Sequence, residues 1–299
     1  MKHYAPNYYK AFHCIASACK HSCCVGWDID IDADSYNRYQ NLTHPYGETL
    51  RKRITLNDDI PCFTLTQEER CPFLQENGLC EMILTLGEAS LCQICRDHPR
   101  FRSFFSDREE IGIGLCCEEA ARLVLSQKEK TEIILLSDDG EQVDLWEEEA
   151  ELLALRDTLF EVLQNRALPL SHRVSAMLQT VNAAPIADLP LWQKRLSALE
   201  QLDPAWQELL DSLTETKRTK DLDLPLEKFT LYLLYRHLPN AADETEVRAT
   251  LRFAALGYTV VKTICENTNT PIEEVARLFS SEIEYSEENT AALLDFLME

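Results

Sequence analysis

Residues 14–32 read CIASACKHSCCVGWDIDID, and this stretch decides the character of the N-terminal part of the chain. Its four cysteines lie at positions 14, 19, 23 and 24, and alternating aspartate and isoleucine residues follow them. The alternation over residues 28–32 predicts a half-buried strand or an extended edge. Thiols at such short spacings indicate a metal site, a disulfide framework or redox chemistry.

The cysteine pattern continues outward from this stretch as far as residue 117, and only Cys265 lies beyond it. The further members are Cys62, Cys71, Cys80, Cys92, Cys95, Cys116 and Cys117. Thiolates are the usual ligands of zinc and of iron–sulfur clusters, because soft sulfur matches these metals. Since a zinc site takes four ligands, so many thiols favour two sites or one cluster with thiols to spare.

The sequence also bears on the compartment. The N-terminus has no apolar run of the kind that a signal peptide requires, and no stretch reaches the roughly eighteen apolar residues of a membrane span. We therefore expect a cytoplasmic protein without a transmembrane segment. Disulfides are rare in that reducing environment, where clustered thiols more often bind metal or do chemistry.

The composition is that of a globular protein with an acidic surface. Of the 299 residues, 45% are hydrophobic and 27% are charged, and the formal net charge is −22. Residues 1–120 hold 12 Lys and Arg against 18 Asp and Glu, and the remainder holds 17 against 33. Such a surface repels phosphate backbones, so we expect no nucleic-acid partner. It suits a lysine-bearing partner, although acidic charge also serves solubility.

Helical spacing dominates the second half of the chain, with prolines near the expected boundaries. Helices are expected over residues 144–165, 171–183, 191–202, 204–213, 226–238, 245–267, 272–279 and 287–298. Asp144 and Glu147 form a capping-box pattern at the first of these helices. Residues 245–267 are apolar nearly all round, which predicts the central buried helix.

The first half is less regular. It predicts helices over residues 83–95 and 118–128 and a short strand over 133–136. We therefore expect a mainly α fold. An irregular cysteine-rich, metal-binding region would occupy residues 1–125, and an α-helical domain would occupy residues 126–299.

Several of these motifs together resemble a known family. They are Tyr9-Lys10-x-Phe12-x-Cys14, Cys19-x3-Cys23-Cys24-x-Gly26-Trp27-x-Ile29-x-Ile31-Asp32, Cys71-Pro-Phe-Leu, Gly78-x-Cys80, Cys95-Arg-x-x-Pro-Arg and Cys117-Glu-Glu-Ala-Ala-Arg-Leu. The cysteine part resembles a cysteine-rich zinc- or iron-chelating domain. The whole set, through residues 4–125, resembles flagellin lysine N-methylase.

This resemblance implies a bacterial enzyme that methylates lysine side chains of flagellin with S-adenosylmethionine and holds an iron–sulfur cluster. The positions that match as candidate ligands are Cys14, Cys19, Cys23, Cys24, Cys71, Cys80, Cys95 and Cys117. A four-iron cluster, 4Fe–4S, takes four protein ligands, or three with one iron left open, so the eight cannot all bind one cluster. Zinc is the alternative metal. Cys62 and Cys92 match no such position, and Cys92 is interpreted as a lone buried thiol.

The sequence names neither a donor-binding motif nor a catalytic base. It lacks the glycine-rich fingerprint of a Rossmann methyltransferase, and Gly26 stands where the radical enzymes that use S-adenosylmethionine would need a third cysteine. Arg100 is a candidate for binding the donor's carboxylate, or forms a structural ion pair. Trp27 and Asp28 are candidates for binding the substrate lysine, or are a buried indole beside an exposed aspartate.

The chief alternative to an enzyme is a non-catalytic zinc- or iron–sulfur-binding interaction module. In that interpretation the thiols hold the metal and the acidic helices dock a partner.

Overall fold

A computed structural model describes residues 1–140, 143–214 and 220–298, and the chain forms two compact units. The larger unit combines Met1–Phe12 with Arg100–Glu299, and the smaller unit is the intervening segment His13–Pro99. The functional division at residue 125 stays a prediction. In the structure, however, residues 1–12 and 100–125 belong to the same unit as the helices of the second half. Most of the cysteines belong to the smaller unit.

The larger unit is mainly helical. Its helices are α5 (Glu118–Leu125), α6 (Glu147–Leu163), α7 (Leu170–Gln179), α8 (Leu189–Ser197), α9 (Pro204–Asp211), α10 (Asp223–His237), α11 (Glu244–Asn267), α12 (Ile272–Phe279) and α13 (Glu287–Met298). Short turns η1 (Tyr9–Ala11) and η4 (Leu238–Asn240) and the π-helix η5 (Ser280–Glu284) join them. The expected helices of the second half are thus present, with boundaries that differ by a few residues.

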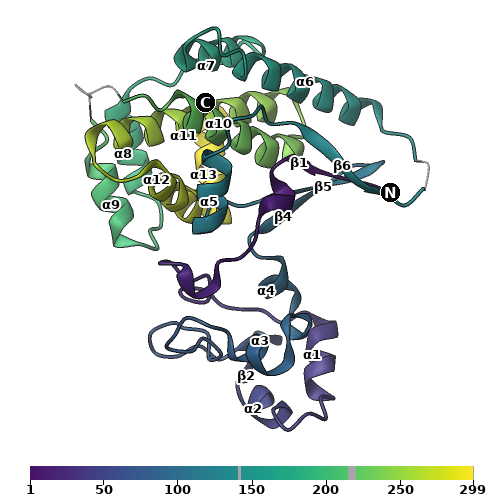
Figure 1. Cartoon of the computed structure of the whole chain (residues 1–299). Coiled ribbons are helices and arrows are strands. Elements are labelled where there is room, and N and C mark those ends of the chain that lie inside the picture. The colour runs from purple at the N-terminus through teal and green to yellow at the C-terminus, as the bar shows by residue number, and fades with distance from the viewer. Residues whose placement is uncertain (141–142, 215–219, 299) are drawn as a thin grey trace. The chain divides into compact units, whose positions relative to one another are not determined.

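Helix α11 is the centre of this unit, as its all-round apolar sequence predicted. It contacts α7, α10, α12 and α13 and is buried along most of its length, and Figure 1 shows it beside α10. Its start is fixed by Asp243, whose carboxylate accepts hydrogen bonds from the backbone N–H groups of Thr245 (2.7 Å) and Glu246 (2.9 Å).

A small mixed sheet, which the sequence analysis missed apart from one strand, completes the larger unit. Its strands lie in the order β4 (Arg100–Phe104), β5 (Arg108–Ile113), β1 (Lys2–Pro6), β6 (Ile133–Asp138). β1 runs parallel to β5, with Lys2 opposite Arg108, and the other pairs are antiparallel. The strands carry many charged residues, so their sequences lack the clear alternation of apolar and polar residues by which a strand is predicted.

Buried polar contacts fasten the sheet to α6 and α10. Glu110 of β5 binds the guanidinium of Arg156 of α6, and both side chains are almost fully buried. The Tyr235 hydroxyl of α10 donates to the carbonyl of Ile111 at 3.1 Å. The Phe101 ring of β4 packs at 6.0 Å from the Tyr235 ring. The sheet is therefore anchored to the helical core.

The smaller unit consists of short elements around a small core. They are η2 (Ala16–Ala18), α1 (Ala33–Gln40), α2 (Gly47–Lys52), β2 (Ile54–Asn57), β3 (Ile60–Phe63), α3 (Glu81–Leu86), η3 (Glu88–Ser90) and α4 (Gln93–Asp97). β2 and β3 form an antiparallel hairpin. The buried core comprises Ile29, Ile31, Tyr39, Leu50, Phe63, Cys71, Phe73, Met82, Leu91 and Cys92.

The helix predicted over residues 83–95 is wrong as a single element. The α-helix ends at Gly87, which has φ +86°, and after the short 3₁₀ turn η3 the chain resumes an α-helix only at Gln93. A positive φ is readily adopted by glycine, so Gly87 separates α3 from the turn that leads to α4.

The capping box predicted at Asp144 is also wrong. Helix α6 starts at Glu147 after Trp146, and no side chain caps it. The Glu149 carboxylate instead accepts a hydrogen bond from the backbone N–H of Ser106 at 3.0 Å. A contact distant in sequence thus replaces the local one.

The alternation at residues 28–32 is confirmed as burial. Ile29 and Ile31 are buried, whereas Asp28 and Asp30 are exposed. The segment forms only an isolated bridge, between Asp30 and Cys62, so it is an extended edge rather than a regular strand.

Within residues 1–140, 143–214 and 220–298, no helix is both long enough and apolar enough to cross a membrane.

Candidate metal centre

Five thiols gather at the core of the smaller unit. Cys71 and Cys92 are buried members of that core, and Cys24, Cys80 and Cys95 pack against it from partly buried positions. Cys24, Cys71 and Cys80 come from three separate segments of the chain. Cys92 is the N-cap residue of α4, and Cys95 lies within that helix. The fold therefore brings together thiols that are up to 71 residues apart in sequence.

Backbone hydrogen bonds hold these segments against one another. The Cys71 N–H donates to the Cys24 carbonyl at 2.8 Å, and the Gly26 N–H donates to the Glu69 carbonyl at 3.0 Å. Leu74 forms an isolated antiparallel bridge with Cys80. Main-chain hydrogen bonds thus hold the segments of Cys24, Cys71 and Cys80 next to one another. The proximity of the three residues therefore does not depend on side-chain packing alone.

The electrostatics of the thiols show how closely they approach. A hydrogen bond with the Cys23 thiol lowers the pKa of Cys24 to about 7, against the opposing effect of burial. Burial, together with the neighbouring thiols of Cys24, Cys80 and Cys92, raises the pKa of Cys71 to about 12. A hydrogen bond with Cys92, followed by burial, raises the pKa of Cys95, and the same bond lowers the pKa of Cys92. The protonation of Cys92 therefore depends on that of Cys95.

The donor set fits a thiophilic metal in type, although the side chains do not already surround one point. In the part of the chain that the structure describes, no group of three or more His, Cys, Asp or Glu side chains has the arrangement of a metal site. Metal sites of this kind are completed on binding, because ligation displaces thiol protons and draws the sulfurs together. Cys24, Cys71, Cys80, Cys92 and Cys95 are the thiols that the fold brings to one core, and they are the candidates for holding such a metal.

Cys92 is the thiol that the sequence analysis set aside. Cys92 is fully buried, and its surroundings include the Cys95 thiol, with which it forms a hydrogen bond, as well as the apolar side chains of the core. The signal that pointed to it was its spacing three residues before Cys95, which places both thiols on the same side of a short helix.

Of the other candidate thiols, Cys23 contacts this group through its hydrogen bond with Cys24. Cys14 and Cys23 are exposed and Cys19 is partly buried, all on the irregular segment around η2. Cys62 is buried in the hairpin strand β3. Cys117 belongs to the larger unit, where it immediately precedes α5. None of the twelve cysteines forms a disulfide.

The candidate substrate and donor residues occupy different surroundings. The Trp27 indole N–H donates to the Cys23 carbonyl at 2.8 Å, and its ring stacks on that of His98 at 6.3 Å. Asp28 is exposed beside it. In the larger unit, Arg100 donates from Nε to the Tyr9 hydroxyl at 3.0 Å and lies over the Phe12 ring at 5.5 Å. Trp27 thus lies on the thiol-bearing segment.

Comparison with curated proteins identifies three relatives. The lysine-N-methylases of Salmonella typhimurium and Salmonella choleraesuis are each 26% identical over 129 residues, which is 40% of this chain and 32% of theirs. The flagellar biosynthetic protein FliU of Salmonella muenchen is 26% identical over 129 residues, 75% of its length. This chain is similar to lysine-N-methylases. The resemblance predicted from the sequence is therefore confirmed as a distant relationship.

The extent of this similarity is limited. The match spans about a third of the length of the two lysine-N-methylases. No protein-family model matches the chain, and no solved structure matches it. The relationship consequently rests on the curated relatives alone.

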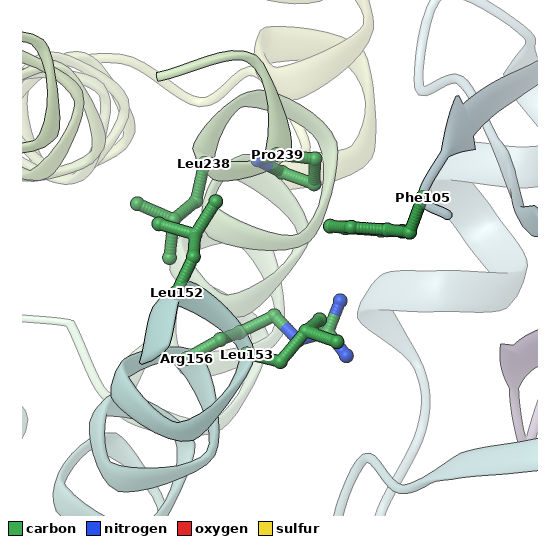
Figure 2. Close-up of a pocket in the computed structure, with 6 residues that line it drawn as sticks. All are labelled: Phe105, Leu152, Leu153, Arg156, Leu238 and Pro239. Carbon is green, nitrogen blue, oxygen red and sulfur yellow. The ribbon is translucent and has the colours of Figure 1, made fainter. Parts of the chain in front are cut away.

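Two hollows of the larger unit add no donor site. Figure 2 shows the first, where Leu152, Leu153 and Arg156 of α6 face Phe105 and the turn at Leu238 and Pro239, and it is too narrow to admit a water molecule. The Arg156 guanidinium beside it is already bound to Glu110. The second is an open groove of about 690 Å³ lined by Lys130, Glu161, Val162, Gln164, Asn165 and Arg166. The first hollow is packing, and the second is open to solvent.

Proposed function

We propose that this protein is an S-adenosylmethionine-dependent lysine N-methyltransferase that acts on flagellin and holds an iron–sulfur cluster. The observation that carries the proposal is the similarity to lysine-N-methylases and to a flagellar biosynthetic protein. The five gathered thiols support it, because the family resemblance implies a thiolate-held cluster and soft sulfur is the ligand that such clusters take.

Four of the gathered thiols are the proposed ligands implied by the resemblance: Cys24, Cys71, Cys80 and Cys95. The geometry adds Cys92 as a fifth thiol at the same place. When bound, the cluster would supply redox or Lewis-acid chemistry to the site. Cys14, Cys19, Cys23 and Cys117 stay proposed ligands from the resemblance, and four protein ligands at most are needed for one four-iron cluster.

Methyl transfer sets simple demands on the other residues. The bond from the methyl carbon to the donor's sulfur breaks as the bond to lysine Nζ forms, the electron pair stays on sulfur, and the amine loses a proton. An exposed carboxylate such as Asp28 would steer the substrate ammonium, and the ring of Trp27 would form an aromatic wall. Arg100 is the proposed partner of the donor's carboxylate. We expect these reactions in the cytoplasm, where the free thiols stay reduced.

Coexpression with the cognate flagellin tests the substrate assignment. Mass spectrometry should find flagellin lysines carrying increments of about 14 Da, because each methyl group replaces a proton. The increments should disappear with Cys95→Ser and persist with the matched control Cys265→Ser, whose thiol is buried among apolar side chains of α11. Raising the salt concentration should weaken modification by screening the acidic surface.

Flagellin that stays unmodified in the presence of donor and fully metal-loaded protein would defeat this assignment and leave the metal centre intact.

The second candidate is a non-catalytic metal-binding interaction module. It is favoured by one observation, that four of the thiols suffice for a structural zinc site. The identity of the metal separates the two functions. Protein purified without oxygen should be brown, absorb near about 400 nm and release acid-labile sulfide if it holds an iron–sulfur cluster. Colourless protein with stoichiometric zinc would favour the module.

A further inference from the structure

Asp32 connects two helices of the smaller unit through a single carboxylate. Its Oδ1 accepts a hydrogen bond from the Ser35 N–H at 2.8 Å and so caps α1. Its Oδ2 accepts a hydrogen bond from the Gln93 N–H, also at 2.8 Å. Gln93 is the first residue of α4 and lies between Cys92 and Cys95. One side chain therefore fixes the start of both helices.

Helix α1 makes further contacts with the segment that leads into Cys92. The buried Tyr39 donates from its hydroxyl to the Ser90 carbonyl at 2.8 Å. Arg38 donates from Nη2 to the Leu91 carbonyl at 3.1 Å. With Asp32 on Gln93, side chains from one helix and its cap bind three of the four residues at positions 90–93.

These contacts are needed because α4 is weak by itself. It has five residues, and a helix of that length is unstable in isolation, since it forms few hydrogen bonds for the residues that it orders. The residue at its N-cap, Cys92, makes no side-chain capping bond. The Asp32 carboxylate accepts the hydrogen bond of the Gln93 N–H at this helix start. The positions of the Cys92 and Cys95 thiols therefore depend on α1 and its cap.

We infer that Asp32 is the positioning residue of the thiol group, which clamps Cys92 and Cys95 of α4 in place beside Cys24, Cys71 and Cys80. This inference rests on the proposed metal centre for its purpose. Each oxygen of the Asp32 carboxylate accepts a hydrogen bond from a backbone N–H group, so the part of Asp32 in this inference is to position the thiols and not to bind the metal. Its role is to keep the two thiols in place before and after metal binding.

The test compares capping aspartates of the full-length protein, purified without oxygen. Asp32→Ala removes the clamp, Asp32→Asn keeps one acceptor oxygen, and Asp243→Ala is the matched control. Asp243 likewise accepts two backbone hydrogen bonds at a helix start, but in the larger unit. Two rates are measured: transfer of bound metal to a chelator, and alkylation of Cys92 and Cys95 by iodoacetamide, read by peptide mass spectrometry.

Asp32→Ala should raise both rates about fivefold, as expected for the loss of one helix cap. Asp32→Asn should give a smaller rise, and Asp243→Ala should leave both rates at the wild-type value. Tyr39→Phe removes only the hydrogen bond to the Ser90 carbonyl and should also raise the alkylation rates of Cys92 and Cys95. This variant replaces Asp32→Ala in the test if Asp32→Ala does not fold.

Wild-type alkylation rates in Asp32→Ala, or in Tyr39→Phe where the former does not fold, would overturn the inference. So would a uniform rise that included Cys265, because that pattern reports general destabilisation. If the wild-type protein holds no metal, the proposed metal centre fails, and the alkylation rates still decide whether Asp32 clamps the two thiols.

Discussion

Buried cysteines of this protein differ in their neighbours rather than in their exposure. Cys71 is 5% exposed and Cys265 is 1% exposed, and burial raises the pKa of each to about 12. The neighbours of Cys71 include other thiols, whereas Cys265 lies in the helical core. The two residues therefore have the same local chemistry, and only their surroundings distinguish a ligand candidate from packing.

Serine substitutions measure this difference. Cys71→Ser, Cys80→Ser and Cys95→Ser should each lower metal content and the yield of soluble protein, because metal binding to thiolates is coupled to folding. Cys265→Ser should change metal content little and cost only packing energy. Metal content per chain, determined for all four purified variants, checks the prediction, and equal values would contradict the assignment.

Glu284 is a buried charge surrounded by polar and basic side chains. Its carboxylate accepts hydrogen bonds from His237 Nε2 at 2.7 Å and from the Tyr232 hydroxyl at 3.1 Å, and Arg236 Nε lies 3.5 Å away. Complete burial alone would raise its pKa, but the charge of Arg236 and the hydrogen bond with His237 hold the pKa of Glu284 below its ordinary value. The residue is thus ionised in the folded protein at neutral pH.

Glu284→Gln should lower the free energy of unfolding by about 3 kcal/mol at pH 7, because it leaves Arg236 without its buried counter-charge. The lowered pKa stabilises the wild-type protein above the unfolded value of about 4.3, and this stabilisation is lost as the pH falls through the folded pKa. The difference between the proteins should therefore shrink on acidification below about pH 4.3. Urea unfolding at several pH values measures it, with the exposed Glu288→Gln as control.

Among the elements, α11 shows how closely the helices of the larger unit approach. Gly257 lies where α11 meets α10, and a Cβ there would stand 2.6 Å from Leu233 Cδ1 and 3.2 Å from Phe229 Cε1. Both neighbours are fully buried and have little room to move. The absence of a side chain at this position therefore permits the contact between the two helices.

Gly257→Ala should destabilise the protein by about 1–3 kcal/mol through overpacking. This exceeds the gain of about 1 kcal/mol that alanine normally brings to a helix interior. Thermal or urea unfolding measures the effect, and Glu244→Ala at the exposed start of α11 should change stability by less than about 0.5 kcal/mol. A stabilised Gly257→Ala protein would contradict the packing described here.

At the scale of the whole molecule, the two units differ in how much core supports them. The larger unit has an extensive hydrophobic core around α10 and α11. The smaller unit has a small core, and two of its buried residues are cysteines. A small core supplies little stabilisation by itself, and domains of that kind commonly depend on metal or disulfides. If the proposed metal is bound, we expect the smaller unit to depend on it and the larger unit to be independent of it.

Hydrogen exchange should show this difference. Removing the metal with a chelator should speed exchange of backbone amides in α1, α3 and α4, because bound metal stabilises only the folded form of its site. Amides of α10 and α11 should keep their protection. Peptide-resolved exchange before and after chelation measures both, and an equal effect on the two units, or no effect, would contradict the prediction.

The helices of the second half and the family resemblance could both be predicted from the amino-acid sequence. Helical spacing is a local signal, and capping residues such as Asp243 mark where it starts, so α11, α12 and α13 were placed within a residue or two. The clustering of the cysteines and the motifs around them are likewise properties of the sequence, because they are defined by spacing along the chain. Both signals survive without knowledge of distant contacts.

The sheet, the division into two units and the identity of the gathered thiols became visible only in the folded protein. The strands of the sheet come from both sides of the smaller unit and pair over about a hundred residues of sequence, which no local pattern records. Cys92 could not be distinguished from a lone core thiol until its neighbours were known. Asp32 likewise appeared as one member of an alternating stretch, and its second hydrogen bond depends on a residue 61 positions away. Local propensity acts within a few residues, whereas these features depend on contacts that form only when the chain folds.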